Sequence, residues 1–366
     1  MNIVFARTHQ IWLTCVMALL LGCTRDVQKT DTASSQHDNA PVADIQVNNP
    51  KPYPFRFVAY GDMRFAERES YGKVIANAKA RQQVIDQIAN DAPAFLVVTG
   101  DFVFRGFHAE DWTYFDQGIK PVRDRGIQIF PAIGNHEVGP FPSQIYGGKA
   151  LQEIEKKTEQ YIASKGLDNY YQEFPDISHK PWYSVRYANC YFLVLDSEID
   201  DEQSNAAQEQ WIRTQLDSIP SEVDYIFVAL HRPPYTALTD DVHKPRKMQI
   251  DLKTLLEDHQ KNSRAHIIVI AGHVHNYERY EGNGVTYIVS GGGGAAQVKF
   301  ARDAKDLYPK NALYGKDDPV DEDQYHYCLF TVNHSKLNFQ MMKLVSKGKS
   351  ITFEPRDSFE LDIAAH

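Results

Sequence analysis

The chain of 366 residues is long enough for one large domain or two ordinary ones, and its hydrophobic content of 43% and aromatic content of 12% can fill a substantial core. Its formal net charge of −9 argues against a nucleic-acid backbone as the main partner, because such a partner requires clustered lysine and arginine. We therefore expect no nucleic-acid scaffold role and interpret the negative charge as a solubility feature.

The first 22 residues have the features of a secretory signal. Met1–His9 carries one basic residue and no acidic one, and Ile11–Leu21 is almost wholly apolar but too short to span a bilayer, which needs roughly 20 residues. The motif Leu-Leu-Gly-Cys ending at Cys23 resembles the lipobox of bacterial lipoproteins, which implies cleavage before Cys23 and lipidation of its thiol. We expect an exported protein, lipid-anchored in the bacterial cell envelope and facing the periplasm or the cell surface. An ordinary secretory signal with an incidental cysteine is the alternative.

Three further segments follow the signal. Residues 23–52 are polar and predict a disordered tether, residues 53–356 form the globular domain, and residues 357–366 are a C-terminal tail. Two cysteines remain in the globular part, Cys190 and Cys328, each in an apolar, strand-like run. An exported protein can pair them in a disulfide, and two buried free thiols are at least equally compatible with the sequence.

Strands alternate with helices along the globular part, which predicts an α/β layered fold with parallel strand pairs. Apolar runs of strand length are followed by segments with helical periodicity, and from Tyr325 to Phe353 the period is two, as in antiparallel strands. The expected strands are Phe55–Tyr60, Ala94–Thr99, Ile127–Ile133, a pair within Trp182–Asp196, Asp224–Leu230, Ala265–Ala271 and Val285–Ser290. The expected helices are Lys73–Asn90, Trp112–Arg125, Leu151–Ser164, Gln208–Leu216 and Lys247–Asp258.

Polar side chains follow these strands at the points where they end. In open α/β sheets, ligand sites gather at the carboxyl ends of the strands. Carboxylates, an amide oxygen and imidazoles suit borderline or hard metal ions, and six such groups exceed what one ion with an open position needs. They can serve two metals that clamp the oxygens of a phosphoryl transfer. The six residues are Asp62, Asp101, Asn135, His231, His273 and His275.

The order of these motifs resembles the calcineurin-like metallophosphoesterase superfamily, over about Phe57 to Ala295. The matching elements are Gly-Asp, Gly-Asn-His-Glu, a lone histidine and Gly-His-Val-His. The segment Gly272–Arg279, the run His231–Tyr235 and the glycines Gly291–Gly294 are most similar to the purple acid phosphatase branch. The resemblance implies a layered αββα sandwich with mixed sheets and helices on the outer faces.

The resemblance also implies a role for each matching residue. Asp101 would bridge two metal ions, divalent or mixed-valence iron, manganese or zinc, with Asp62 and His275 on the first and Asn135, His231 and His273 on the second. His136 would contact the phosphate and protonate the leaving oxygen, and Glu137 would orient His136. Arg232 and His243 are weaker candidates for phosphate contact, for which a structural role is the alternative.

Two positions depart from the pattern of the superfamily. Arg64 stands two residues after Asp62, where a metal-binding histidine is frequent, and Phe104 stands three residues after Asp101, where purple acid phosphatases supply a tyrosine ligand. The first metal therefore lacks an expected protein ligand under either pattern. Arg64 can instead bind the substrate phosphate as a bidentate donor or pair with Asp62.

Two functions fit these observations. The first is an exported, metal-dependent phosphoric-ester hydrolase, a phosphatase or phosphodiesterase, in which a hydroxide held by a dinuclear centre attacks the phosphorus. Its partners would be a phosphoric ester and, through the N-terminal lipid, the membrane. The alternative is a non-catalytic binding or surface lipoprotein with a degenerate metal site on the same fold, which Arg64 and Phe104 favour.

Overall fold

The computed structural model describes residues 44–47, 50–67, 75–139, 149–238, 240–298, 324–348 and 350–363, and for residues 149–157 it describes the backbone alone. The expected signal 1–22, Cys23 and most of the expected tether lie outside the described residues, so the lipid anchor stays a prediction. Among the described helices, none combines the length and the apolar character that crossing a membrane requires.

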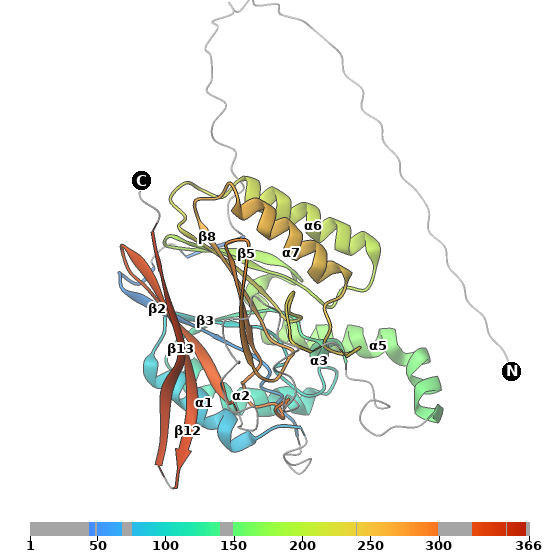
Figure 1. The fold of residues 1–366 in the computed structure, drawn as a ribbon. Coiled ribbons are helices and arrows are strands. Elements are labelled where there is room, and N and C mark those ends of the chain that lie inside the picture. The colour runs from blue at the N-terminus through green and yellow to red at the C-terminus, as the bar shows by residue number, and fades with distance from the viewer. Residues whose placement is uncertain are drawn as a thin grey trace, which may run out of the picture. The chain divides into compact units, whose positions relative to one another are not determined.

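Helices and strands alternate over the first two thirds of the described chain, as the sequence predicts (Figure 1). The helices are α1 (Ala78–Asp91), α2 (Ala109–Arg123), α3 (Asn135–Val138), α5 (Lys149–Glu173), α6 (Glu202–Asp217) and α7 (Lys247–Gln260). The strands are β1 (Ile45–Gln46), β2 (Phe55–Tyr60), β3 (Phe95–Val98), β4 (Gln128–Pro131), β5 (Tyr183–Tyr187), β6 (Cys190–Val194), β7 (Tyr225–Leu230), β8 (His266–Ala271), β9 (Tyr277–Gly282), β10 (Val285–Ser290), β11 (His326–Val332), β12 (Lys336–Lys347) and β13 (Ser350–Asp362).

The strands form two mixed sheets. In the described residues, one sheet has seven strands in the order β1-β5-β6-β7-β8-β10-β9, and the other has six in the order β13-β12-β11-β2-β3-β4. Strands β6, β7, β8 and β10 run parallel, as do β2, β3 and β4. The later strands β11, β12 and β13 pair antiparallel. The parallel strands point their carboxyl ends toward the same edge of each sheet, which is where the candidate site lies.

The two sheets pack face to face over an aromatic core. The Phe57 ring stacks between Phe95 and Phe330, with centroid distances of 5.1 and 4.6 Å, and meets Phe227 of the other sheet edge-on at 4.9 Å. Aromatic pairs of this kind each contribute about 0.5–1.5 kcal/mol beyond the burial of their surface. This inter-sheet core fixes the relative position of the two sheets and so of the loops that leave their carboxyl edges.

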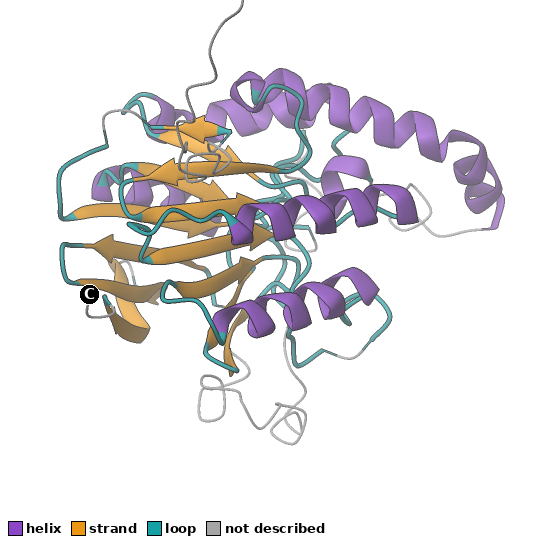
Figure 2. Ribbon diagram, turned by 90° about the horizontal axis from the view of Figure 1, so that it is seen from above, coloured by secondary structure: helices purple, strands orange, loops and turns teal. Residues whose placement is uncertain are grey.

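Helices cover the outer faces of both sheets (Figures 1 and 2). On the seven-stranded sheet, Ile212 and Leu216 of α6 and Leu256 of α7 belong to one apolar cluster with side chains of β6, β7 and β8. On the six-stranded sheet, α1 and α2 pack apolar side chains such as Val84 and Phe115 into the cluster that includes β2 and β3. The layers are therefore helix, sheet, sheet, helix, and the expected αββα sandwich is confirmed.

Several boundaries differ from the sequence expectation. Ile45 and Gln46 pair with β5, and the Lys51 amide donates to the Tyr187 hydroxyl, so part of the expected tether is bound to the domain. At the other end β13 continues to Asp362, because its whole length pairs with β12, so residues 357–362 belong to the sheet and not to a tail.

The central part of the chain also holds unexpected structure. α5 runs to Glu173, beyond the expected Ser164, and Tyr277–Gly282 forms a strand that is not among the expected ones. α1 begins at Ala78 because the Asn77 side chain accepts a hydrogen bond from the Ala80 amide and caps the helix there. Of the two open alternatives for the cysteines, the structure holds Cys190 and Cys328 as buried free thiols.

Candidate metal centre

The loops that leave the parallel strands carry the six predicted ligand residues. Asp62 follows β2, Asp101 follows β3 and His273 follows β8, and all three have positive φ angles of 58°, 54° and 69°. A positive φ is strained for residues with a side chain and persists where the surrounding structure enforces it, as it does at functional sites. Gly100, with φ of 90°, precedes one of these turns and lies against Gly134 of the next loop, where a Cβ would clash with backbone.

Asn135, His231 and His273 form the first group of polar atoms. His231 Nε2 and His273 Nδ1 each lie 2.9 Å from Asn135 Oδ1, and these two nitrogens lie 3.2 Å from each other. His231 Nε2 is also 3.3 Å from Asp101 Oδ1. Three ligand atoms at such mutual distances can all reach one ion at about 2.0–2.2 Å, the usual range for zinc with nitrogen or oxygen ligands.

The outward-facing ring nitrogens decide which tautomers are present. His231 Nδ1 lies 2.8 Å from the Thr99 carbonyl, which only accepts, so Nδ1 carries the proton and Nε2 turns its lone pair to the site. For His273 two tautomers fit: Nε2 donates to the Val242 carbonyl at 3.0 Å, or it accepts from Arg232 Nη1 at 2.7 Å. In the first tautomer Nδ1 is unprotonated, and its lone pair faces Asn135 and can bind a metal ion. Backbone carbonyls that orient imidazoles in this way are usual around metals.

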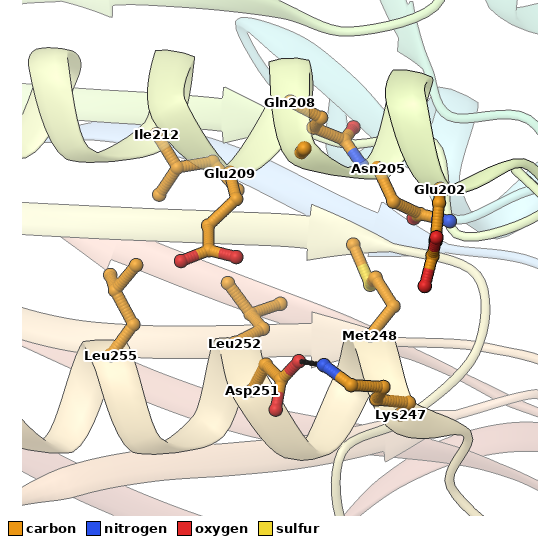
Figure 3. Close-up of a pocket in the computed structure, with 11 residues that line it drawn as sticks. Glu202, Asn205, Gln208, Glu209, Ile212, Lys247, Met248, Asp251, Leu252 and Leu255 are labelled. Atoms are coloured by element: carbon orange, nitrogen blue, oxygen red, sulfur yellow. Dashed lines mark hydrogen bonds and ion pairs between the residues drawn. The ribbon is translucent and has the colours of Figure 1, made fainter.

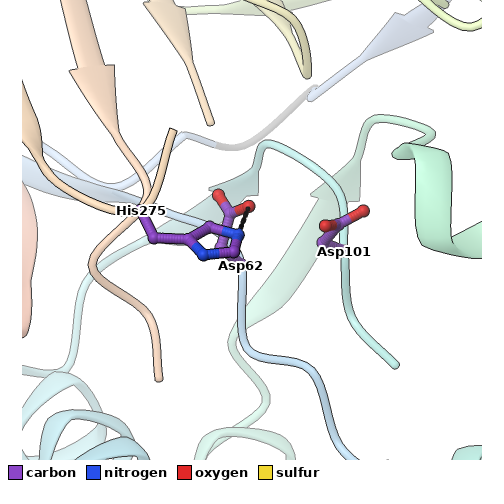
Figure 4. Close-up of side chains that lie close together, drawn as sticks. All are labelled: Asp62, Asp101 and His275. Atoms are coloured by element: carbon purple, nitrogen blue, oxygen red, sulfur yellow. Dashed lines mark ion pairs between the residues drawn. The ribbon is translucent and has the colours of Figure 1, made fainter. Parts of the chain in front are cut away.

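Asp62, Asp101 and His275 form the second group. Ligand atoms of these three buried residues all lie within 4.8 Å of one another, and Figure 4 shows the His275 ring directed at the Asp62 carboxylate, with Nε2 3.6 Å from Oδ1. His275 Nδ1 donates to the Ala296 carbonyl at 2.7 Å, whereas its Nε2 is buried and has no hydrogen-bond partner. A buried lone pair directed at one carboxylate and close to a second fits a metal ion, since burying it unpaired is costly.

The pKa values of the two carboxylates shift in opposite directions. Burial, and after it the charge of Asp101, raise the pKa of Asp62 well above its usual range. Burial also opposes ionisation of Asp101, yet His231, His136 and Arg64 together hold the pKa of Asp101 well below its usual range. Two neighbouring carboxylates in a dry site cannot both ionise without a compensating cation. Arg64 already balances the charge of Asp101, and a metal ion between the two carboxylates would supply the positive charge that Asp62 lacks.

Arg64 contacts Asp101, and not Asp62 as one of the two sequence alternatives proposed. Its Nε and Nη2 lie 3.2 and 3.1 Å from Asp101 Oδ2. Arg81 of α1 donates to the carbonyls of Met63 and Arg64 at 3.2 Å each, which holds this loop in place. The guanidinium therefore occupies one face of the carboxylate that the resemblance assigns as the metal bridge.

His136 lies where the sequence placed it, but a different group orients it. Its Nδ1 donates to the Phe104 carbonyl at 2.7 Å, and its Nε2 faces the centre 3.8 Å from Asp101 Oδ2. Burial, and then the charge of Arg64, lower the pKa of His136 to about 3. The expectation that Glu137 orients this ring is wrong, because the Glu137 carboxylate points to backbone amides.

Glu137 instead joins two of the loops that carry ligands. Its Oε2 accepts from the amides of Asp101 and Gly134 at 2.8 Å each, and its Oε1 accepts from the amide of Phe102 at 3.0 Å. A carboxylate is an acceptor at both oxygens, so it suits three N–H groups arranged in this way. Glu137 thus fixes the loops after β3 and β4 against each other.

We expect Glu137→Gln to lower the free energy of unfolding by about 2 kcal/mol, since both carboxylate oxygens accept from backbone N–H groups and the amide NH₂ of glutamine would meet one of them. Urea denaturation of the two proteins measures the difference. Glu209→Gln, an exposed residue of α6 that pairs with Arg213, is the matched control and is expected to change stability by less than about 0.5 kcal/mol. Equal unfolding midpoints for Glu137→Gln and wild type would contradict the assigned role.

Arg232 and His243 border the centre but hold other groups. Arg232 Nε donates to Glu198 Oε2 at 2.9 Å and Nη1 to the Val242 carbonyl at 3.0 Å, so its side chain, buried beside His273, is a positioning group. His243 Nδ1 lies 2.9 Å from both oxygens of Asp240, and its ring is 5.3 Å from that of His273. For Arg232 these contacts favour the structural alternative over direct phosphate contact.

The loop that carries Glu198 contains a buried acid with a shifted pKa. Burial raises the pKa of Asp196 to about 7, and its Oδ1 accepts from the Glu198 amide at 2.8 Å. The folded chain therefore keeps a proton that the unfolded chain releases near pH 4. The stability that this proton contributes is complete below about pH 4 and is lost as the pH rises toward 7.

We expect Asp196→Asn to remove this dependence, because the amide keeps the acceptor oxygen and cannot ionise. Over pH 4 to 7 the wild type should lose stability relative to the variant by on the order of 4 kcal/mol, which follows from a shift of about three pKa units. Urea denaturation across this pH range measures the slope of each protein. Parallel curves for the two proteins would show that Asp196 is already ionised in the folded state.

A cleft of about 720 Å³ opens beside the metal centre. Arg64, Asn135, His136 and His273 lie in its lining, together with the side chains of Arg232 and His243. A second hollow, of about 370 Å³, lies between α6 and α7 (Figure 3), where Lys247 and Asp251 form an ion pair. The residues that line this second hollow include none of the predicted site residues, which lie instead in or beside the first cleft.

Backbone groups complete the centre, and sequence reasoning missed most of them. The amides of Ala295 and Val298 donate to the carbonyls of Asp62 and His275, so the segment after β10 crosses both ligand loops. The run Gly291–Gly294 permits this, because a Cβ on Gly293 would clash with the Gly61 carbonyl. The glycine run was visible in the sequence, whereas backbone carbonyls leave no residue-type signal.

Comparison with known proteins gives one family and several distant relatives. The family described as calcineurin-like phosphoesterase matches residues 43–277, a range that includes all six predicted metal ligands. A protein of Hordeum vulgare named nucleotide pyrophosphatase/phosphodiesterase is 24% identical, over 82% of this chain and 85% of its own length. A probable inactive purple acid phosphatase of Arabidopsis thaliana is 26% identical, over 80% of this chain and 49% of its own.

A solved structure shares the fold. The purple acid phosphatase from yellow lupin (Lupinus luteus) seeds superposes with a TM-score of 0.62 at 21% identity, covering 85% of this chain and 54% of the lupin chain. The chain thus spans about half the length of the Arabidopsis and lupin proteins.

Proposed function

Because this chain belongs to the calcineurin-like phosphoesterase family, we propose that it is a metal-dependent hydrolase of phosphoric esters, a phosphatase or phosphodiesterase. The observation that carries the proposal is the arrangement of six metal-binding side chains in two groups that share Asp101. The family uses a dinuclear metal centre, and each of the two groups offers donor atoms that suit one metal ion. Iron, manganese and zinc all accept such ligands.

Asp62, Asp101 and His275 would hold one ion, and Asn135, His231 and His273 the other. Bound there, the metals would polarise phosphoryl oxygens and lower the pKa of water to about 7. The orphaned Nε2 of His275 and the clustered acceptors around Asn135 support this assignment.

The remaining groups of the centre act on the substrate. Arg64 is a permanent cation in the cleft, and when it leaves Asp101 it can donate two hydrogen bonds to a phosphoryl group. His136 presents Nε2 to the same space while its Nδ1 donates to the Phe104 carbonyl, and with its pKa lowered to about 3 the ring holds a lone pair on Nε2. The ring would therefore first take up the acidic proton of a phosphoric-ester monoanion at Nε2 and then pass that proton to the leaving oxygen.

The leaving-group dependence of a His136→Gln variant tests this proposal. p-Nitrophenolate leaves without a proton, so turnover of p-nitrophenyl phosphate should fall by about tenfold or less, whereas turnover of glycerol 2-phosphate should fall by about 100-fold or more. His259→Gln on α7 is the matched control and should leave both rates near those of wild type. Equal losses on the two esters would remove the proton-donor role, and absence of turnover by the metal-loaded wild type would overturn the proposed function.

We also propose that the protein is exported and lipid-anchored at Cys23 in the bacterial cell envelope. The support is the amino-terminal sequence: a basic start, an apolar run and the Leu-Leu-Gly-Cys motif. Expression with radiolabelled palmitate, followed by recovery of the protein from the membrane fraction, tests the anchor. Cys23→Ser should abolish both the label and the membrane association.

A binding protein with a degenerate site is the second candidate. The ion pair between Arg64 and Asp101 favours a degenerate site, since the guanidinium takes the place of a metal ion at the Asp101 carboxylate. Phe104 favours it as well, because a phenyl ring cannot bind a metal ion as a tyrosine does. Relatives named probable inactive purple acid phosphatases are consistent with this reading. Retention of all six metal-binding side chains favours the hydrolase.

A further inference from the structure

Part of the cleft lining is apolar, and the metal ligands do not account for it. Besides Val242, four apolar side chains line the cleft, from four separate segments: Ile75 before α1, Phe104 after β3, Val138 at the end of α3 and Ala163 in α5. Phe104 and Ile75 also pack together in a small apolar cluster, separate from the main core clusters. These side chains bring apolar surface to the edge of a polar site.

The apolar part of the lining adjoins His136 through Phe104. The ring centroids of Phe104 and His136 are 5.3 Å apart, with 34° between the ring planes, and the Phe104 carbonyl holds His136 Nδ1. One residue thus orients the imidazole through its backbone and borders it with its ring. A group whose oxygen meets His136 Nε2 would lie against the Phe104 side of the cleft.

Apart from Val242 and Gly139, the rest of the lining is polar, and it includes Glu159, which lies one turn before Ala163 in α5. Arg232, His243 and Arg246 lie on the side of His273, whereas Ile75, Val138 and Ala163 are apolar. The volume of about 720 Å³ falls within the range of roughly 300–1,000 Å³ typical of sites for drug-sized ligands. A phosphoryl group at the metal centre would leave most of this space to the rest of the substrate.

We propose that Ile75, Phe104, Val138 and Ala163 form a subsite for an aromatic leaving group, so that the substrates are phosphoric esters of an aryl or nucleoside ring system. This inference rests on the proposed function and adds the substrate class. A planar ring matches the Phe104 side chain, because aromatic pairs gain stability beyond the burial of their surface. Phe104, which stands where purple acid phosphatases have a tyrosine ligand, would thus select the substrate instead of binding the metal.

Binding of phosphonates, which are not hydrolysed, tests the subsite without requiring turnover. Isothermal titration of the metal-loaded protein should show benzylphosphonate binding about tenfold more tightly than methylphosphonate. Phe104→Ala should reduce this preference to about twofold, and Phe104→Leu should keep an intermediate preference because it retains apolar volume. Tyr161→Ala, an exposed residue of the same α5 helix, is the control and should keep the full preference.

The outcomes separate the two proposals. Equal binding of the two phosphonates by the wild type would overturn the subsite and leave the hydrolase standing. Binding of neither phosphonate would overturn both. A full preference that persists in a folded Phe104→Ala variant would also overturn the subsite, and the persistence of methylphosphonate binding shows that the variant is folded. Tighter binding of an adenosine phosphonate than of benzylphosphonate would assign the nucleoside, and the reverse order the simple aryl group.

Discussion

Asp101→Asn is expected to lower kcat/KM for phosphoric esters by about 100-fold or more. Asp101 is fully buried and stands between the two groups of ligands: its Oδ1 is 3.3 Å from His231 Nε2, and its Oδ2 receives Arg64. The amide keeps the shape but removes the negative charge that both groups share. Metal content per chain should fall together with activity, and elemental analysis measures it on the same sample.

Asp241→Asn is the matched control for this experiment, because Asp241 is 94% exposed and lies in the loop before α7. It should leave activity and metal content at wild-type values. The His136 amide donates to Asp101 Oδ1 at 3.0 Å, so an unfolding curve must accompany the measurement to show that Asp101→Asn retains the fold. Turnover of folded Asp101→Asn at the wild-type rate would contradict the mechanism.

Arg64→His should raise affinity for metal at the Asp62, Asp101 and His275 group by at least about tenfold. The substitution removes the guanidinium from Asp101 Oδ2 and restores an imidazole where the superfamily often has one. Isothermal titration with manganese or zinc, which needs no turnover, measures the change. Turnover is expected to respond differently, because the variant also loses a donor for the phosphoryl group.

Arg64→Gln separates the two effects of that substitution. It removes the positive charge from Asp101 without adding a strong ligand, so its metal affinity should lie between those of wild type and Arg64→His. If both variants bound metal no better than wild type, Arg64 would not compete with a metal ion for Asp101, and the shortage of ligands at the first group would not limit binding.

Much of the fold could be predicted from residue patterns. The runs at Phe55–Tyr60 and Asp224–Leu230 are long, apolar and bounded by turn residues, and the structure contains β2 and β7 there. The shorter or polar elements were harder. Tyr277–Gly282 carries charged residues and becomes a strand only because β10 pairs with it along its whole length, which is a tertiary effect.

The ends of the domain show the same limit. Ile45 and Gln46 lie in a polar stretch with little to bury, yet they pair with β5. The residues after Arg356 alternate weakly and form a strand because β12 offers an unpaired edge. Pairing partners distant in sequence decide such segments, and composition alone carries no information on them.

The candidate site could likewise be predicted only in part. Residue types at strand ends predicted the six ligands, and the structure brings them together in two groups. The orienting groups could not be predicted in this way, since Thr99, Phe104, Val242 and Ala296 act through backbone carbonyls that every residue type possesses. Glu137 was recognised as important, but its partners are backbone amides and not the neighbouring imidazole.

Metal content and turnover, measured together on one sample, test the central claim most directly. Protein purified without residues 1–22 would be analysed for bound metal by elemental analysis and assayed with p-nitrophenyl phosphate and bis(p-nitrophenyl) phosphate before and after chelation. We predict bound metal and hydrolysis of at least one ester, with both lost on chelation and regained with manganese, zinc or iron. No bound metal and no turnover after reconstitution with each of these ions would contradict the hydrolase and favour the binding protein.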